Sequence, residues 1–455
     1  MAEPAEAGCD MLERMFRRPG TITKVAGSKE KGAKLIAPSD RLRKCRIVIA
    51  AAYEPIHPSV HDLASVLKQL GYEIILVGLQ CTNPLGPPLP DLGLYEAVYE
   101  FAQPRWLDGS RVGAPARRPL ARLYDKIMHR TASFFLPVFP ATLLFPKRAV
   151  NRLAAAIKSA PFDFILAIDK GGMGLAAALN EDGAICYYSL ELYTKTDILT
   201  RQTPLVRALW KLERRNSGRI ECVVIQDESR WQILRDDLDL IGAEPAYLPL
   251  SEFPAASSVP SAYWHRKYGL PRETKILLCY GAIRPERSCL DIARSAPNLP
   301  PQWTLIFHGP CTDRTETEIL HAASGAPVIV SRELVDFEKR NELVAGADIG
   351  LAIYDNVSVN DVLTGRSSEK IALYLKWGCP VIARRYPSYE HLEDAHCAYL
   401  IDHADEIPAT VAVIERDLES CSRAAKDCFE RYYRADKNLR RASRKILAAM
   451  ARKDL

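Results

Sequence analysis

The segment Gly365-Arg-Ser-Ser-Glu-Lys-Ile-Ala-Leu-Tyr-Leu-Lys-Trp-Gly-Cys-Pro-Val381 predicts a short helix followed by a buried strand. The hydroxyls of Ser367 and Ser368 suit the start of the helix, because their oxygens accept backbone N–H groups that have no helical partner. Gly378 is expected to end the helix, and the apolar run 380–383 is expected to form the strand.

The start of this helix is also a candidate anion site. Free N–H groups and the helix dipole favour negative charge at a helix N-terminus. Arg366 and Lys370 add two positive charges within one turn. The alternative is an ordinary capped helix without a ligand, so the flanking sequence has to decide between the two interpretations.

The size and composition of the chain indicate a globular protein with two domains. Its 455 residues exceed what one ordinary hydrophobic core holds, and 48% apolar with 26% charged residues is typical of globular folds. A net charge of +5 does not by itself imply nucleic acid binding. The 12 cysteines include no Cys-x-x-Cys pair, the N-terminus lacks a secretory signal, and no apolar run reaches a membrane-spanning length. These features predict a cytoplasmic location.

Apolar runs separated by helical stretches predict two successive doubly wound α/β halves, each built on a parallel sheet. Strands of the first half are expected at 46–51, 72–78, 162–168, 185–189 and 222–225. Strands of the second half are expected at 276–280, 303–307, 328–330, 349–353 and 380–383. Ligands of such sheets bind outside the carboxyl ends of the strands, so the cleft between the halves is the expected site.

Several segments match, in order, those of a known enzyme family. The matching segments are Cys186–Leu192, Ile276–Arg287, Ala347–Ile353, Ser368–Ile382 and Phe429–Tyr433. Through them the chain resembles the retaining glycosyltransferases of family 4, also called group 1, over roughly residues 46–440. The resemblance implies the GT-B fold, in which two Rossmann-like domains face an interdomain cleft and a C-terminal helix crosses back to the first domain.

The domain organisation that follows from this resemblance has five parts. They are a flexible extension (1–44), an N-terminal acceptor-side Rossmann-like domain (45–252), a linker (253–273), a C-terminal nucleotide-sugar-binding Rossmann-like domain (274–430) and the crossing helix (431–455).

The chain also departs from the family pattern and therefore looks like a divergent branch. Many family members carry two Glu residues near the donor helix, and those places hold Gly365 and Leu373. The second Glu usually holds the nucleotide ribose. Ala282 takes the first place of the family's basic pair, although Arg284 lies two residues further on and Arg287 takes the Lys place.

The resemblance implies a hexosyltransferase of polysaccharide biosynthesis. Such an enzyme moves a sugar from a nucleotide diphosphate sugar to a glycan or lipid-linked acceptor, with retention, without a metal ion and without a cofactor. Two alternatives stay open: a nucleotide-sugar epimerase or hydrolase of the same fold, and a catalytically silent glycosyltransferase-like partner subunit. Asp237-Leu-Asp239 has the spacing of a metal-bound diphosphate site, but it lies in a helical stretch, so no metal is expected there.

Candidate site residues fall into three groups. Arg284, Arg287 and Lys370 are expected to be catalytic, because fixed cations stabilise a departing diphosphate and guanidinium groups bind phosphate bidentately. The expected donor-binding residues are Gly281, Asn360, Asp361, Arg366, Ser367, Ser368 and Glu369. The expected acceptor-side residues, in loops at strand ends that face the cleft, are His57, Asp169 and Glu191. The structural alternatives are solvated charges for the two arginines, a turn at 360–361 and a structural loop residue at 57.

Residues 105–152 contain ten Lys or Arg around an apolar, aromatic middle. Such a segment can lie in the interface of an anionic membrane, which would suit a lipid-linked acceptor at the inner membrane face. Equally, it can be an insertion of the acceptor domain with a solvated basic face. The expected partners are thus a nucleotide sugar, a glycan or lipid-linked acceptor and a membrane surface, and no nucleic acid. The sequence does not identify the donor sugar and base, the acceptor, the linkage or the oligomeric state.

Overall fold

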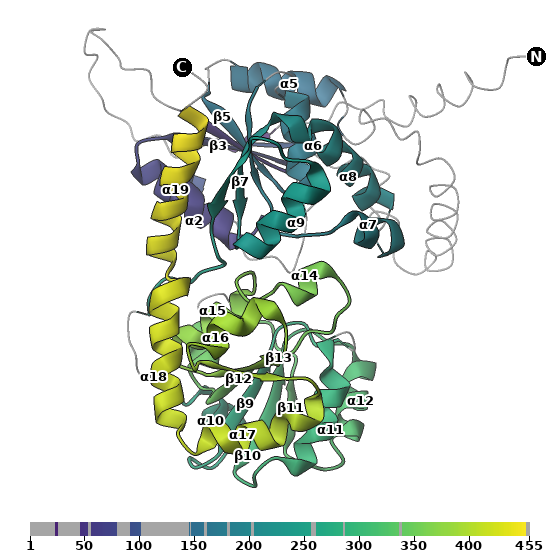
Figure 1. The fold of residues 1–455 in the computed structure, drawn as a ribbon, viewed down its shortest axis with the longest axis vertical. Helices are drawn as coiled ribbons and strands as arrows, with labels where there is room; N and C mark the ends of the chain where they lie inside the picture. The colour runs from purple at the N-terminus through teal and green to yellow at the C-terminus, as the bar shows by residue number, and fades with distance from the viewer. Residues whose placement is uncertain are drawn as a thin grey trace, which may run out of the picture.

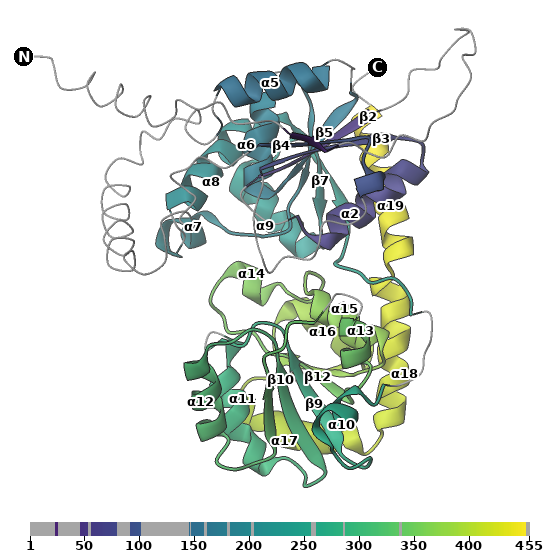
Figure 2. The same ribbon diagram turned by 180° about the vertical axis from the view of Figure 1, so that it is seen from behind.

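The computed structural model shows two α/β domains stacked end to end (Figures 1 and 2). It describes residues 23–25, 46–52, 56–79, 92–101, 145, 147–158, 162–179, 183–201, 204–255, 261–284, 287–335 and 339–451. Each domain has a central sheet with helices on both faces, which confirms the two doubly wound halves expected from the sequence.

The described part of the first domain contains an eight-stranded sheet in the order β1-β4-β3-β2-β5-β6-β7-β8. Neighbouring strands are parallel except for β1, which pairs antiparallel with β4. The strands are β1 (Thr23–Val25), β2 (Arg46–Ala51), β3 (Glu73–Leu79), β4 (Ala97–Phe101), β5 (Phe164–Ile168), β6 (Ile185–Tyr188), β7 (Ile220–Ile225) and β8 (Glu244–Tyr247). The predicted strands correspond to β2, β3, β5, β6 and β7, which read as apolar runs because helices cover both faces.

Successive residues of the central strand β2 point to opposite faces of this sheet. Ile47 and Ile49 pack with α2 and α19, whereas Val48 and Ala50 pack with α5, α6, α8 and α9. The helices of this layer are α2 (Pro58–Gln69), α5 (Lys147–Lys158), α6 (Asp169–Leu179), α7 (Lys195–Arg201), α8 (Pro204–Asn216), α9 (Glu228–Leu238) and α19 (Ala435–Ala451).

The second domain contains a parallel sheet in the order β11-β10-β9-β12-β13-β14. Its strands are β9 (Lys275–Tyr280), β10 (Trp303–His308), β11 (Val328–Ser331), β12 (Ile349–Ala352), β13 (Val381–Arg384) and β14 (Ala398–Ile401). The first five are the predicted ones. Helices α10, α13, α15 and α18 pack on one face and α11, α12 and α17 on the other. The helices, with two short ones at the strand ends, are α10 (Tyr263–Tyr268), α11 (Cys289–Ser295), α12 (Asp313–Ala322), α13 (Lys339–Val344), α14 (Val359–Val362), α15 (Glu369–Lys376), α16 (Glu390–Glu393), α17 (Ile407–Glu415) and α18 (Leu418–Cys428).

Two chain crossings between the domains lie side by side. The backbone N–H of Glu252 donates to the carbonyl of Tyr433 (3.0 Å), and the N–H of Ala435 donates to the carbonyl of Glu252 (2.9 Å). The second crossing is a π-helical turn (Phe429–Tyr433) that leads from α18 into α19. α19 then packs on β7 and β8 of the first domain, so the C-terminal helix crosses back as expected (Figure 1).

The opening segment of the sequence forms α15, its C-terminal turn and β13. Gly378 follows the helix in the left-handed conformation with a φ of 75°, which fits its predicted place after the helix end. The Tyr374 hydroxyl donates to the carbonyl of Leu278 (2.8 Å) and accepts the N–H of Tyr280 (3.0 Å). α15 is thereby fixed on β9, and its first turn lies at the carboxyl end of the sheet.

Gly350 on β12 provides a test of this packing. A methyl group there would come within 2.4 Å of the Tyr374 ring. We therefore expect Gly350→Ala to lower the free energy of unfolding by about 1–3 kcal/mol, because an overpacked core must shift. Thermal unfolding against Gly218→Ala, where no atom lies within 4 Å of the added methyl, measures the difference. Equal melting temperatures for the two variants would contradict the packing described for α15.

Candidate functional site

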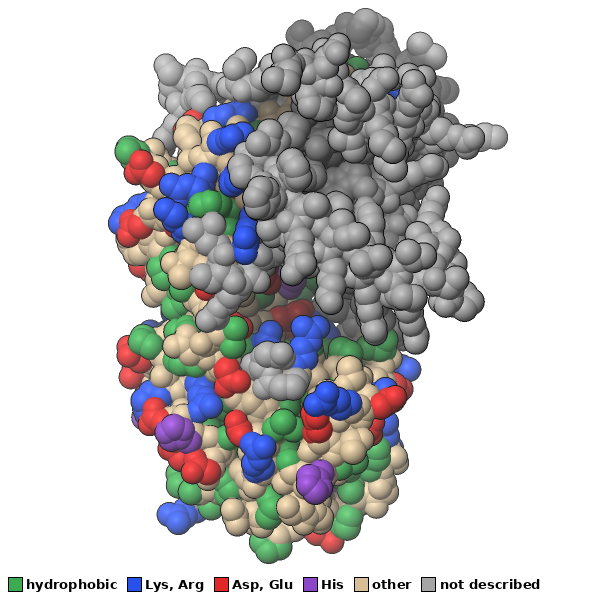
Figure 3. Space-filling model, turned by 90° about the vertical axis from the view of Figure 1, so that its right-hand side faces the viewer, with side chains coloured by type: hydrophobic (Ala, Val, Ile, Leu, Met, Phe, Trp, Pro, Cys, Tyr) green, Lys and Arg blue, Asp and Glu red, His purple; other side chains and the backbone are tan. Residues whose placement is uncertain are grey.

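The candidate site lies where the second domain faces the first, at the carboxyl ends of the strands of the second domain. The loop after β9, the residues after β12 and the start of α15 all reach this edge, because β9 and β12 are parallel neighbours. In Figure 3, basic and acidic side chains and a histidine are visible where the two domains meet.

Two cations, Arg287 and Lys370, converge on one aromatic ring at this edge. The guanidinium carbon of Arg287 lies 4.7 Å from the centre of the Tyr354 ring, and Nζ of Lys370 lies 4.5 Å from it. Gly281 lies next to Lys370. Its φ is 116°, and a Cβ there would lie 4.0 Å from Nζ of Lys370. We call Arg287 and Lys370 the cation pair.

The cation pair is not neutralised within the described part of the chain. No carboxylate of the described residues forms an ion pair with Arg287 or Lys370. The thiol of Cys279 lies close enough to be affected by these charges. A hydrogen bond with Cys289, followed by the positive charges of Lys370 and Arg287, lowers its pKa. The loop after β9 and the start of α15 thus form one positive pocket, which suits a diphosphate.

The serine hydroxyls at the start of α15 do not cap the helix. Ser368 occupies the N-cap position, but its hydroxyl shares a 2.8 Å hydrogen bond with the hydroxyl of Tyr354. Ser367 donates to the carbonyl of Leu363 (2.9 Å) and accepts from Arg230 (3.0 Å). The prediction that both hydroxyls accept free helix N–H groups was wrong, because side chains distant in sequence offer competing partners.

The side chains of the remaining predicted donor-side residues have other surroundings or partners. Arg284 is exposed on the same loop as Arg287. The guanidinium carbon of Arg366 lies 5.0 Å from the ring centre of Tyr432, next to the interdomain crossing. The Glu369 carboxylate accepts from Arg340. Of the residues proposed for donor binding or catalysis, the structure therefore brings together Gly281, Arg287, Ser368 and Lys370.

Arg230, on α9 of the first domain, forms an interdomain contact with residues 360–367 of the second domain, the predicted donor loop. Its side chain is 0% exposed and donates to Ser367 Oγ (3.0 Å), Leu363 O (3.3 Å) and Asn360 Oδ1 (3.0 Å) across the interface. The amide of Asn360 donates in turn to Glu191 Oε2 (2.7 Å). We call Arg230, Glu191, Asn360 and Ser367 the interdomain catch.

Two further predicted donor-binding residues, Asn360 and Asp361, have structural partners. Asn360 belongs to the interdomain catch, and Asp361 lies in the first turn of α14. Both polar atoms of Asn360 are occupied, since its oxygen also accepts the N–H of Leu192 (3.2 Å). Asp361 accepts from the hydroxyl of Ser358 (2.7 Å) at the start of α14. These contacts join the two domains and fix the loop that leads into α15.

His57, on the opposite wall, begins α2 as its N-cap residue. Its Nδ1 accepts the backbone N–H of Ser59 (3.2 Å) and lies 2.8 Å from the Ser59 hydroxyl, which is 3.1 Å from the hydroxyl of Tyr188. Burial lowers the pKa of His57. A neutral imidazole with its proton on Nε2 satisfies these contacts, and no acceptor for this N–H is found among the described residues.

Asp169 and Glu191 lie at the ends of β5 and β6, as expected. Asp169 is buried and has a positive φ of 47°; its carboxylate accepts the N–H groups of Leu190 (2.7 Å) and Glu191 (3.1 Å). Asp169 therefore shapes the loop after β6, whereas Glu191 belongs to the interdomain catch.

A buried ionic network lies beside the crossing segments. Arg340 on α13 pairs with Glu252 of the first crossing and with Glu369 at the start of α15. Lys376 also pairs with Glu252 (3.3 Å). Burial, followed by the negative charges of Glu252 and Glu369, raises the pKa of Asp62 on the facing helix α2 to about 6.

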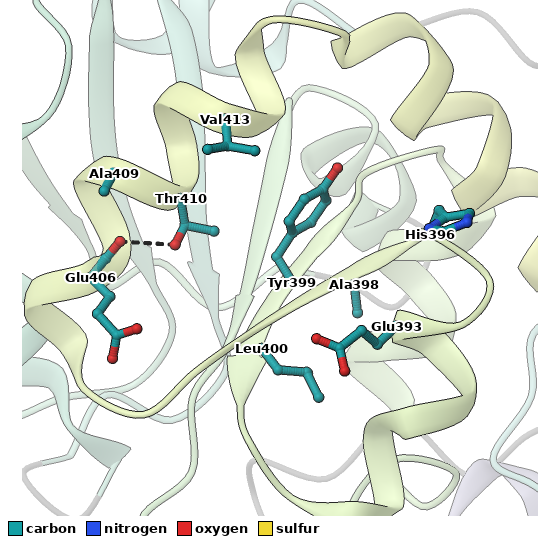
Figure 4. Close-up of a pocket in the computed structure, with 9 residues that line it drawn as sticks. All are labelled: Glu393, His396, Ala398, Tyr399, Leu400, Glu406, Ala409, Thr410 and Val413. Carbon is teal, nitrogen blue, oxygen red and sulfur yellow. Dashed lines mark hydrogen bonds between the residues drawn. The ribbon is translucent and has the colours of Figure 1, made fainter.

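A separate hollow of about 430 Å³ lies on the second domain between β14 and α17 (Figure 4). It contains no Lys or Arg, so it does not suit a phosphate. Its lining residues are Glu393, His396, Ala398, Tyr399, Leu400, Glu406, Ala409, Thr410 and Val413. None of them belongs to the interdomain cleft.

Neither a metal cluster nor a membrane-spanning helix is present among the described residues. No cluster of three or more His, Cys, Asp or Glu side chains there is arranged to hold a metal ion. No helix there is long and apolar enough to cross a membrane. Most of the basic segment 105–152 lies outside the described residues.

Comparison with known proteins identifies the fold. Neither a protein-family model nor a curated protein sequence matches the chain. Sucrose-phosphate synthase from Thermosynechococcus elongatus is similar in structure, with a TM-score of 0.59 and 12% identity; the match covers 89% of this chain and 100% of that one. Anabaena HepE in complex with UDP and glucose matches with the same values. An α,α-trehalose-phosphate synthase (UDP-forming) from Burkholderia vietnamiensis has a TM-score of 0.56 and 10% identity, covering 89% and 99%. The chain therefore has the two-domain GT-B fold.

Removing Arg230 should loosen the interdomain catch. Arg230→Met leaves buried carbonyl, amide and hydroxyl oxygens without their donor, so we expect about 2–4 kcal/mol lower stability and more separated domains. Thermal unfolding and the radius of gyration from small-angle scattering measure both effects. Arg235→Met, also on α9 with a side chain 43% exposed, is the matched control. If the two variants behave alike, the catch does not hold the domains together.

Asp62 should make stability depend on pH. Because its folded-state pKa (about 6) lies above the ordinary value of 3.8, the folded protein binds this proton more tightly than the unfolded chain. Its favourable contribution is complete below pH 3.8 and is lost as pH rises through 6. Asp62→Asn should therefore be more stable than wild type by about 1–3 kcal/mol at pH 7 and equal to it near pH 4. A difference in melting temperature that is the same at both pH values would contradict this assignment.

Proposed function

We propose that this chain is a glycosyltransferase that moves a sugar from a nucleotide diphosphate sugar to a glycan or a lipid-linked acceptor. The observation that carries the proposal is the cation pair: Arg287 and Lys370 meet beside Gly281 without a neutralising carboxylate among the described residues. In the GT-B fold this pocket opens on the interdomain cleft, where the donor of such an enzyme would be held between two domains.

The cation pair would stabilise the departing diphosphate. When the bond between the anomeric carbon and the phosphate oxygen breaks, negative charge develops on that oxygen. Arg287 offers a planar set of donors to phosphate oxygens and Lys370 a compact charge, so both interactions strengthen as the charge develops. This chemistry requires no metal ion, and we propose none.

We propose transfer with retention, as the family 4 resemblance implies. The acceptor hydroxyl would attack from the face that the diphosphate leaves, forming the new bond between its oxygen and the anomeric carbon. Its proton would pass to the departing phosphate oxygen. A strong side-chain base is then unnecessary, which agrees with the engaged carboxylates of Asp169 and Glu191. His57 would contribute a neutral N–H donor from the acceptor side.

Structures of the same fold support a nucleotide sugar as the donor. Anabaena HepE is described in complex with UDP and glucose, and the Escherichia coli trehalose-6-phosphate structure is described as bound with UDP-2-fluoro glucose. The latter match has a TM-score of 0.58 and 12% identity. A cytoplasmic location and contact of segment 105–152 with the inner membrane face remain part of the proposal, because a basic, aromatic segment suits an anionic membrane.

Substitution of the cation pair tests the proposed pocket. UDP or GDP in large excess should raise the melting temperature of the wild-type protein by about 2–6 °C. Arg287→Ala and Lys370→Ala should each weaken nucleotide binding by about 10- to 100-fold, because each removes a charge-assisted contact. Titration calorimetry measures the affinities. Arg294→Ala, an exposed arginine on α11 that pairs with Asp291, should bind like wild type.

The alternatives give different results in the same experiments. Consumption of a nucleotide sugar without an acceptor would indicate a hydrolase or epimerase. Absence of binding to any nucleotide diphosphate would favour a silent partner subunit and contradict the transferase proposal. Unchanged affinity in both alanine variants, with binding in the wild type, would move the donor site away from the cation pair.

A further inference from the structure

Tyr354 connects the two halves of the positive pocket. Its ring is the common contact of Arg287, from the loop after β9, and Lys370, from the first turn of α15. Its hydroxyl shares a hydrogen bond with Ser368 at the start of the same helix. The residue is only 4% exposed, so this ring belongs to the interior of the domain and not to its surface.

The backbone of Tyr354 is also held. The hydroxyl of Tyr386 donates to its carbonyl (2.9 Å), and the residue lies two positions after β12. The ring is therefore fixed by the sheet on one side and by Ser368 on the other. A side chain that is locked in this way can fix the groups that pack on it.

Two like charges that share a small space repel each other when no anion lies between them. The negative face of an aromatic ring attracts cations and offsets part of this repulsion without occupying the place of a ligand. The described residues supply no carboxylate to the cation pair. Among them, the Tyr354 ring is therefore the group that offsets the repulsion between the two charges.

We propose that Tyr354 is a positioning residue that holds Arg287 and Lys370 in place to receive a diphosphate. This inference rests on the proposed function, because it assigns the pocket to a diphosphate group. It goes beyond that function because it names the residue that keeps the two cations in position. This residue is neutral and does not itself bind phosphate. The ring carries this role, and the hydroxyl orients the ring.

Three substitutions separate the role of the ring from that of the hydroxyl. Tyr354→Phe keeps the aromatic face and removes the bond to Ser368. Tyr354→Leu and Tyr354→Met remove the aromatic face but keep an apolar side chain in the core; Met retains more volume and is the variant to use if Leu prevents folding. Tyr399→Leu, which lines the separate hollow of Figure 4, is the matched control for loss of a partly buried tyrosine from the same domain.

Calorimetric titrations with inorganic pyrophosphate, UDP and uridine measure the effect on the full-length protein. We expect Tyr354→Phe to bind pyrophosphate and UDP within about 3-fold of wild type. We expect the Leu and Met variants to bind both about 10-fold or more weakly, with uridine affinity unchanged. Loss of pyrophosphate and UDP affinity by the same factor identifies an effect on the cation pair, because general damage to the domain would weaken uridine binding too.

The outcomes distinguish the positioning role from the proposed function. If the wild type binds neither pyrophosphate nor UDP, the diphosphate site itself fails. If the wild type binds both and the Leu and Met variants bind them equally well, the diphosphate site stands and the role of Tyr354 is overturned. Weakened binding in Tyr399→Leu equal to that in the Tyr354 variants would likewise overturn it, because the effect would then be general loss of packing.

Discussion

One buried guanidinium group, that of Arg230, fixes how the two domains meet. A charged side chain with no exposed surface is costly unless hydrogen bonds replace its water. Here four oxygens do so, and three of them belong to the donor loop of the other domain. Because separation of the domains would break these hydrogen bonds, the interdomain catch favours the arrangement in which the domains contact each other. The paired crossings at Glu252 and Tyr433 hold the opposite side.

The catch also explains why polar residues that face the cleft are not all substrate ligands. Asn360 and Ser367 use their side chains to satisfy Arg230 and Glu191, and Asp169 uses its carboxylate to hold the loop after β6. Among the described residues, the groups without such partners are the cation pair on one wall and the N–H of His57 on the other. The two walls thus differ in charge: one is strongly positive, and the other offers a neutral donor.

The sequence predicted the architecture well because the relevant signals are local. Continuous apolar runs identified ten strands, and Gly378 identified the end of α15. Four strands of the described part were not predicted; in β8, for example, Glu244 and Pro245 disrupt the apolar pattern. Arg287 and Lys370 could be placed together because parallel neighbouring strands bring their following loops to one edge.

Side-chain partners could not be predicted in the same way. The hydroxyl oxygen of Ser367 accepts from a guanidinium group 137 positions away in the chain, so local capping rules predicted the wrong donor. Tyr354 was missed although it directly follows a predicted strand, because its importance comes from partners on two other segments, the loop after β9 and the start of α15. Both cations lie in the second domain, whereas His57 lies in the first. In the proposed reaction, binding of the diphosphate would therefore depend on the geometry within one domain, whereas alignment of the acceptor would depend on the interdomain catch. Donor binding and acceptor alignment would thus be controlled by different interactions.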